Sequence, residues 1–167
     1  LQKLALQLGA DVPVFVFGQT AFAEGVGEIL RPLSAPPAWY VVLMPPVQVP
    51  TAAIFAAPEL TRNSPPLKIA RFSAGMGRND LQPVVVSRYS EVARHLEWLG
   101  QFGEARMTGS GACLFASFGT EDTARDVLRH PAGLNDTLLD LVAMATTADA
   151  APTTQTRAVS KEIMDKI

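Results

Sequence analysis

The chain has 167 residues, of which 48% are hydrophobic and 18% charged, so it can bury a substantial core and is not a disordered protein. A net charge of −2 argues against a surface that binds nucleic acid or an anionic membrane. A single cysteine excludes an internal disulfide, and no apolar run reaches the roughly 20 residues that span a bilayer. The first residue is a leucine within a helical pattern, so we expect a fragment of a longer protein.

The first residues predict the end of a helix, followed by a fixed carboxylate. The apolar residues of this helix recur at the spacing of one helical face: Leu1, Leu4, Ala5 and Leu8. Gly9 is expected to end the helix in a left-handed cap, and Pro13 to prevent it from resuming. Residues 12–17 read as a short strand or buried extended segment. Asp11 would then lie on a short, stiff connection, where a carboxylate suits general-base or metal chemistry, although it could also be an ordinary turn residue.

The middle of the chain predicts extended segments, a linker and one short helix. Residues 20–30 read as a second extended segment around two glycines, and the proline-rich residues 31–38 as a linker. The continuous apolar run 39–44 predicts a buried strand. A short helix is expected from Pro50 or Thr51 to Phe55, before a loop over 59–66.

The second half predicts alternating helices and strands. Helices are expected over residues 81–99 (preceded by Asn79 and Asp80), 121–128 (with Thr120 as N-cap) and 135–145, and strands over 105–107 and 112–118. Residues 146–156 are small, polar and low in complexity, which predicts disorder. This order of elements is typical of an α+β fold in which helices cover one face of an antiparallel sheet.

Two glycines lie between the two strands of the second half, in Thr108, Gly109, Ser110 and Gly111. Such a loop lets the backbone approach a ligand, and its successive N–H groups can bind an anion. It lacks the lysine of a Walker loop and the first glycine of a nucleophile elbow, and a tight hairpin turn is the alternative. Cys113 beside it reads as a small buried hydrophobe, and the distant histidines give no zinc-ligand spacing.

Taken together and in order, residues 8–15, 21–30, 50–55 and 107–113 resemble the GHMP family of small-molecule kinases. The resemblance is strongest to its members that act on a cytidine-diphosphate-linked methylerythritol in the non-mevalonate isoprenoid pathway, and it covers about residues 1–134. It implies a cytoplasmic enzyme that uses ATP and Mg²⁺ to phosphorylate a hydroxyl of a small-molecule substrate, without nucleic-acid or membrane partners.

The resemblance also implies roles for particular residues. Asp11 lies at the position of the family's catalytic aspartate, which accepts or orients the proton of the substrate hydroxyl. Phe55 matches an aromatic residue that stacks on cytosine, and Thr51 lies near the same pocket. Residues 108–111 match a glycine-rich loop beside the nucleotide phosphates. No metal ligand is predicted.

Three regions are predicted from this comparison. Residues 1–33 would close an N-terminal kinase domain, 34–134 would form a C-terminal α/β sandwich with helices packed on an antiparallel sheet, and 135–167 would be a divergent, partly disordered tail. The family's catalytic lysine and its triphosphate-wrapping loop are not among these residues, so we expect no appreciable turnover from them alone. The family's last strand is also expected to be missing, leaving a sheet edge unpaired.

Two alternatives remain open. One is another GHMP kinase, of the homoserine or mevalonate type. The other is a non-catalytic α+β module that binds a ligand, which would leave Asp11 and the glycine loop without a joint purpose.

Overall fold

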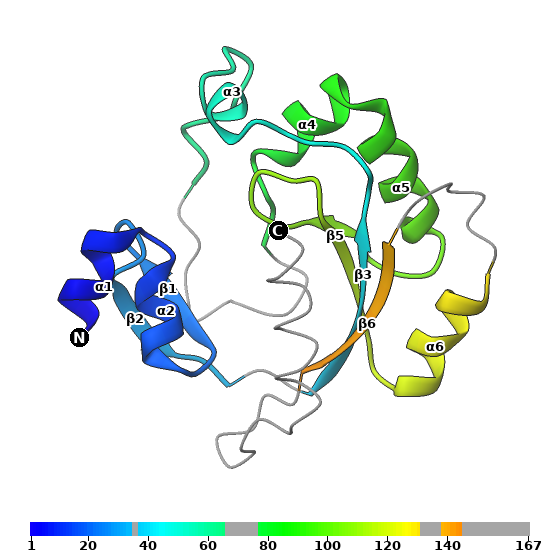
Figure 1. The fold of residues 1–167 in the computed structure, drawn as a ribbon, viewed down its shortest axis with the longest axis horizontal. Helices are drawn as coiled ribbons and strands as arrows, with labels where there is room; N and C mark the ends of the chain where they lie inside the picture. The colour runs from blue at the N-terminus through cyan, green and yellow to red at the C-terminus, as the bar shows by residue number, and fades with distance from the viewer. Residues whose placement is uncertain (35–36, 66–76, 131–137, 145–167) are drawn as a thin grey trace. The chain divides into compact units, whose positions relative to one another are not determined.

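A computed structural model of the chain describes residues 1–34, 37–65, 77–130 and 138–144. It divides into two compact units, of which the first contains Leu1–Pro37 and the second Ala38–Met144. Figure 1 shows the helices and strands of both units.

The first unit consists of a pair of short helices and a β-hairpin. Helix α1 (Gln2–Leu8) packs against α2 (Val12–Phe17). Strands β1 (Ala21–Glu24) and β2 (Ile29–Pro32) pair in antiparallel fashion, with Glu24 opposite Ile29 next to the turn.

The first unit corrects three predictions. Residues 12–17 are helical, because Pro13 lies in the first turn of α2, where its missing N–H leaves no hydrogen bond unmade. Gly9 has φ 162°, which is extended backbone, and the left-handed cap belongs instead to Gly18 (φ 73°), whose N–H donates to the Val14 carbonyl. The extended segment predicted over residues 20–30 is two strands of one hairpin.

The second unit is built on a four-stranded antiparallel sheet with the strand order β4-β5-β3-β6. Its strands are β3 (Ala38–Met44), β4 (Arg106–Met107), β5 (Leu114–Phe118) and β6 (Leu138–Met144). Its helices are α3 (Thr51–Phe55), α4 (Gln82–Arg88), α5 (Ser90–Gly100) and α6 (Glu121–Arg129).

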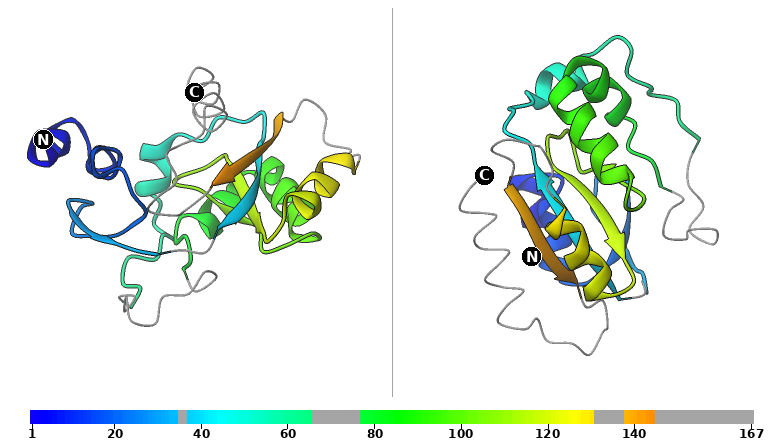
Figure 2. Two further views of the ribbon diagram at one scale, coloured as in Figure 1. Left: turned by 90° about the horizontal axis from the view of Figure 1, so that it is seen from below. Right: turned by 90° about the vertical axis from the view of Figure 1, so that its right-hand side faces the viewer.

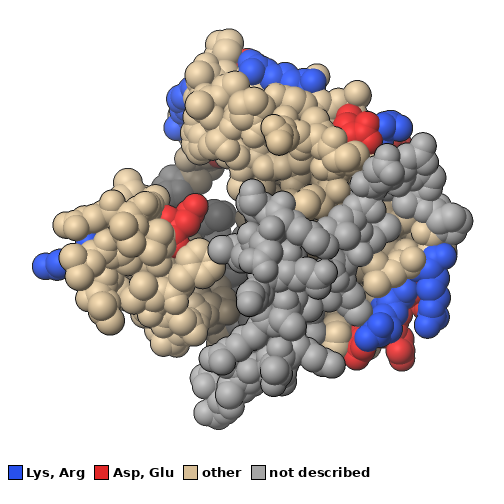
Figure 3. Space-filling model, in the orientation of Figure 1, with Lys and Arg blue, Asp and Glu red and all other residues tan. Residues whose placement is uncertain are grey.

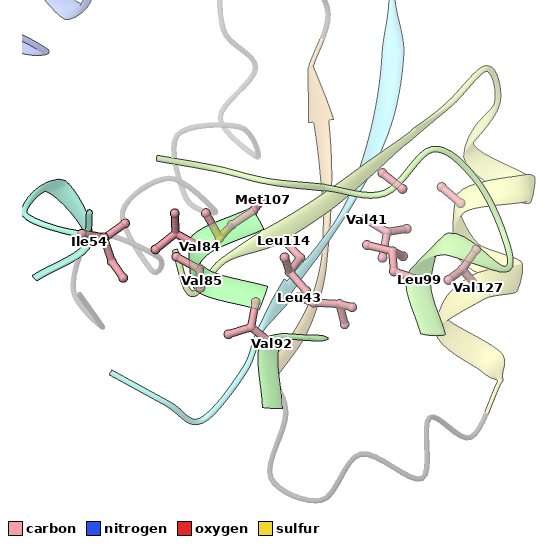
Figure 4. Close-up of a cluster of buried hydrophobic side chains, with 13 residues drawn as sticks. Val41, Leu43, Ile54, Val84, Val85, Val92, Leu99, Met107, Leu114 and Val127 are labelled. Atoms are coloured by element: carbon pink, nitrogen blue, oxygen red, sulfur yellow. The ribbon is translucent and has the colours of Figure 1, made fainter. Parts of the chain in front are cut away.

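One hydrophobic core lies between this sheet and its helices. Alternate residues of β3, Val41 and Leu43, are fully buried, as are Leu114 and Ala116 of β5. They form one cluster with buried residues of α4, α5 and α6, so these helices share a single face of the sheet (Figures 2 and 4). The predicted α+β class, with helices packed on an antiparallel sheet, is confirmed.

Local elements of the second unit agree with the sequence more closely than those of the first. The strand predicted over residues 39–44 and the helices predicted over 51–55 and 121–128 are present, and the Thr120 hydroxyl accepts the Thr123 N–H as an N-cap. The helix predicted over 81–99 is two helices, because Tyr89 is extended (φ −123°, ψ 91°).

The helix predicted over residues 135–145 is wrong, because Leu138–Met144 forms the strand β6. It pairs along the whole of β3, with Ala38 opposite Met144 and Met44 opposite Leu138. Because β6 pairs with it, β3 is not an edge strand of the sheet. The disorder predicted over 146–156 lies outside the described residues.

Charged side chains on the described surface are often paired with opposite charges. On α6, Arg125 lies 2.5 Å from Glu121, and Arg129 lies 2.7 Å from Asp126; acidic and basic side chains lie together there in Figure 3. Exposed pairs of this kind typically contribute less than about 1 kcal/mol each.

No helix among the described residues is long and apolar enough to cross a membrane.

Truncating a buried side chain of the sheet should destabilise the second unit. Leu114→Ala should lower the free energy of unfolding of the second unit by about 2–5 kcal/mol, because the side chain is fully buried and leaves a cavity. Both tryptophans, Trp39 and Trp98, lie in this unit, so their fluorescence in a urea titration measures the loss. Leu8→Ala is the matched control, because Leu8 is 81% exposed and should change this transition little. Equal shifts for the two variants would contradict the assigned core.

Candidate functional site

Asp11 lies between the two helices of the first unit, at the N-cap position of α2. It is exposed, and its side chain makes no capping hydrogen bond. An aspartate placed for a turn or a cap ordinarily accepts a nearby backbone N–H. Among the described residues, no hydrogen bond or ion pair is found for this carboxylate, so it is free to accept a proton or a hydrogen bond from a ligand.

The β-hairpin approaches the backbone next to Asp11. A Cβ built on Gly27 would lie 2.4 Å from the carbonyl oxygen of Ala10, and Gly27 has φ +108°. Both facts require glycine, because a side chain would collide with this carbonyl and strain the backbone. The turn is held further by Glu28, whose carboxylate accepts the Val26 N–H at 2.7 Å. The glycine-containing segment 21–30 therefore supports the connection that carries Asp11.

The glycine-rich loop of the second unit is a tight turn between β4 and β5. The Thr108 N–H donates to the Cys113 carbonyl at 2.9 Å, and the Gly111 N–H donates to the Thr108 carbonyl at 3.0 Å. Gly109 (φ +53°) and Gly111 (φ +89°) have backbone conformations that side chains rarely adopt. The hairpin-turn interpretation thus describes the backbone, and it remains compatible with anion binding through the exposed part of the loop.

The N–H groups of Gly109 and Ser110 make no hydrogen bond within the described part of the chain. Gly109 is exposed and Ser110 is partly exposed. N–H groups that lack a protein acceptor are the feature a phosphate oxygen requires.

Helix α3 lies beside this loop. The hydroxyls of Thr51 and Ser110 lie 2.7 Å apart, which joins the first turn of α3 to the loop. Phe55, at the other end of α3, is 55% exposed, whereas its neighbour Ile54 is fully buried. Phe55 is therefore not a core residue. Its exposed ring is suited to stacking against a planar base.

Arg62 holds the end of α3, and its role was not predicted from the sequence. Its guanidinium donates to the carbonyls of Phe55 (2.6 Å), Ala57 (3.2 Å) and Leu60 (3.1 Å). Of these, the Phe55 carbonyl is one that a helix leaves unsatisfied at its C-terminal end, whereas Ala57 and Leu60 follow α3. A basic residue soon after a predicted helix is the signal that could have suggested this contact.

The structure brings together some of the predicted site residues. Thr51, Phe55 and residues 108–111 are all in the second unit, and Thr51 contacts Ser110 directly. Asp11 is in the first unit.

Other chemistry near the loop is limited. Burial raises the pKa of the Cys113 thiol, which keeps it protonated and agrees with its interpretation as a small buried hydrophobe. The described residues contain no group of three His, Cys, Asp or Glu side chains that could hold a metal ion.

In an open pocket of about 290 Å³ near Asn79, both arginines of the described lining are paired with carboxylates. Its Arg78 lies 2.8 Å from Asp80, and its Arg106 pairs with Glu104. The glycine loop is therefore the better candidate for an anion site.

Sequences of known proteins match most of this chain. Residues 57–131 match the family described as GHMP kinases C terminal, which confirms the resemblance to GHMP kinases over this segment. A protein of Thiobacillus denitrificans named 4-diphosphocytidyl-2-C-methyl-D-erythritol kinase is 78% identical over 143 residues, which cover 86% of this chain and 50% of that protein. A protein of the same name from Nitrosospira multiformis is 62% identical over 131 residues, covering 77% of this chain and 45% of that protein.

A solved structure shares the fold. The crystal structure of a 4-(cytidine 5'-diphospho)-2C-methyl-D-erythritol kinase matches with a TM-score of 0.68 and 29% sequence identity, over 86% of this chain and 57% of that one. The chain thus spans about half the length of the curated relatives it matches.

Proposed function

We propose that this chain supplies the acceptor-binding part of an ATP-dependent kinase that phosphorylates a hydroxyl of 4-diphosphocytidyl-2-C-methyl-D-erythritol in the non-mevalonate isoprenoid pathway, in the cytoplasm. The observation that carries the proposal is the 78% identity over 143 residues to a protein of that name. Three features are suited to this activity: the exposed ring of Phe55, and the Asp11 carboxylate and the N–H groups of Gly109 and Ser110, for which no partner is found among the described residues.

Each group has a distinct task in the proposed reaction. The acceptor oxygen bonds to the γ-phosphorus of ATP as the bond to the β,γ-bridging oxygen breaks, which releases ADP and a proton. Asp11 orients the hydroxyl and accepts that proton, which leaves late when the transition state is loose. The loop N–H groups of Gly109 and Ser110 bind phosphate oxygens. Mg²⁺, when bound with ATP, neutralises phosphate charge.

Phe55 and Thr51 account for the choice of acceptor. A pyrimidine ring stacked on Phe55 would be held by a contact that a small acceptor without a base cannot make. Thr51, one helical turn earlier, carries a hydroxyl that can hydrogen-bond a polar group of the same ligand.

The test uses the chain joined, in front of Leu1, to the N-terminal half of the Thiobacillus denitrificans relative, called the joined protein below. We expect it to transfer phosphate from ATP to the diphosphocytidyl acceptor, as followed by ³¹P NMR, and to leave homoserine and mevalonate unmodified. The 167-residue chain alone should show no appreciable transfer. A folded joined protein that preferred homoserine or mevalonate would overturn the acceptor assignment, and one that bound ligand without transfer would favour a non-catalytic module.

A further inference from the structure

Asn79 is bound to the glycine loop by both N–H groups of its side-chain amide. Nδ2 donates to the carbonyl of Met107 at 2.9 Å and to the carbonyl of Gly109 at 2.7 Å. Its Oδ1 accepts the N–H of Leu81 at 3.0 Å, which fixes the amide at the start of α4. An asparagine amide has two donors, and here both are used on the loop.

The two carbonyls that Asn79 engages belong to the residues on either side of Thr108. Carbonyl oxygens repel an anion, whereas N–H groups attract it. By binding these two oxygens, Asn79 fixes the peptide groups of the loop while the N–H groups of Gly109 and Ser110 stay without a protein acceptor in the described residues.

The first residue of α4, Gln82, also holds Met107, through the N–H of that residue. Gln82 Oε1 accepts the N–H of Met107 at 2.8 Å. The Met107 side chain is itself buried beside Val84 and Val85 of α4 (Figure 4). The start of α4 therefore anchors the entrance of the loop through polar and apolar contacts together.

The other end of the loop, at Gly111, packs closely against Met107 and Val85. A Cβ on Gly111 would lie 3.0 Å from the sulfur of Met107 and 3.5 Å from a methyl carbon of Val85. The loop thus has little freedom to shift at either end, and the carbonyl of Gly109 between them is held by Asn79.

We propose that Asn79 is a positioning residue that holds the Thr108–Gly111 loop in the conformation that takes the phosphates of the nucleotide. This inference rests on the proposed function for the part that concerns the nucleotide. The positioning of the loop is a property of the chain itself and can be measured without any ligand.

Asn79→Asp is the informative variant, because it keeps the size of the side chain and an oxygen for the Leu81 N–H. It replaces the donor of two hydrogen bonds with an oxygen that repels the carbonyls of Met107 and Gly109. In the 167-residue chain we expect hydrogen exchange of the Thr108 and Gly111 amides, measured by NMR, to accelerate at least about tenfold. Asn63→Asp is the matched control, because it adds the same charge at an exposed position for which no hydrogen bond is found among the described residues.

In the joined protein, Asn79→Asp should raise the KM for ATP by about tenfold or more and change the KM for the diphosphocytidyl acceptor less than about twofold. A general loss of structure would raise both constants together. Asn79→Ser replaces the two amide donors with one hydroxyl on a shorter side chain and adds no charge; it should show the same split and serves if the aspartate variant does not fold.

The outcomes separate the two proposals. Unchanged exchange at Thr108 and Gly111 in both folded variants, or equal changes of the two KM values, would overturn the positioning role. Faster exchange together with a joined protein that binds no ATP would uphold the positioning of the loop and reject its proposed function as a phosphate site.

Discussion

Asp11→Asn in the joined protein is expected to lower the turnover number by about 10²–10⁴-fold, the usual contribution of a general base. Asparagine keeps the size of the side chain but removes its charge and its basicity. The KM for the acceptor should change little, because the lost interaction strengthens mainly in the transition state. Stopped assays of ADP release over a range of acceptor concentrations give both constants.

Folding should survive this substitution because the Asp11 side chain is exposed and makes no capping hydrogen bond. Asp122→Asn is the matched control, since it makes the same chemical change at an exposed aspartate of α6. It should leave turnover within about twofold of the parent, as expected for a surface position. A folded Asp11→Asn protein that kept more than about a tenth of the parent's turnover would contradict the catalytic role of Asp11 and favour the turn-residue interpretation.

The surroundings of Asp11 could be predicted only in part from the sequence. Residues 9–13 predicted a break between two elements, and this break exists, but the second element is a helix and not a strand. A short apolar run such as 12–17 fits either structure by periodicity alone. The close approach of Gly27 to the Ala10 carbonyl depends on a hairpin turn 16 positions after Asp11, and no local pattern indicates it.

The error over residues 138–144 has a similar cause. The apolar residues of this segment recur at positions that suit a helical face as well as a strand. Pairing with β3, almost 100 residues earlier in the chain, selects the strand through backbone hydrogen bonds that the segment cannot form by itself. The same argument applies to Asn79, whose partners are backbone carbonyls 28 and 30 positions later in the chain and whose role leaves no motif of residue types.

The elements next to the proposed ligands were predicted better, because local rules decide them. Pro50 and Thr51 start α3 as expected, since proline cannot extend a helix backward and is tolerated at its start. Two glycines in residues 108–111 indicated left-handed conformations, and both have positive φ. What these rules could not predict is the contact between the two, the Thr51–Ser110 hydrogen bond.

Phe55→Ala in the joined protein is expected to weaken binding of the diphosphocytidyl acceptor by about 5- to 150-fold, which corresponds to the roughly 1–3 kcal/mol of one stacked base. ATP binding should change less than about twofold, because the contact is made by the cytosine. The ring is 55% exposed, so its removal opens no large cavity and should lower the free energy of unfolding by less than about 1 kcal/mol. Isothermal titration with each ligand measures the two affinities separately.

Two further variants separate stacking from packing at this position. Phe55→Leu keeps an apolar side chain but has no aromatic face, so it should bind the acceptor almost as weakly as the alanine variant. Ile54→Ala removes a fully buried neighbour on the same helix, and should lower the free energy of unfolding by about 2–5 kcal/mol. If Phe55→Ala behaved like Ile54→Ala, with a large loss of stability and equal losses for acceptor and ATP, Phe55 would be a packing residue. If both the alanine and the leucine variants lose acceptor binding but keep ATP binding and stability, the Phe55 ring must stack on a planar group of the acceptor. Of the contacts considered, only stacking depends on the aromatic ring, and losing it leaves the rest of the second unit unchanged.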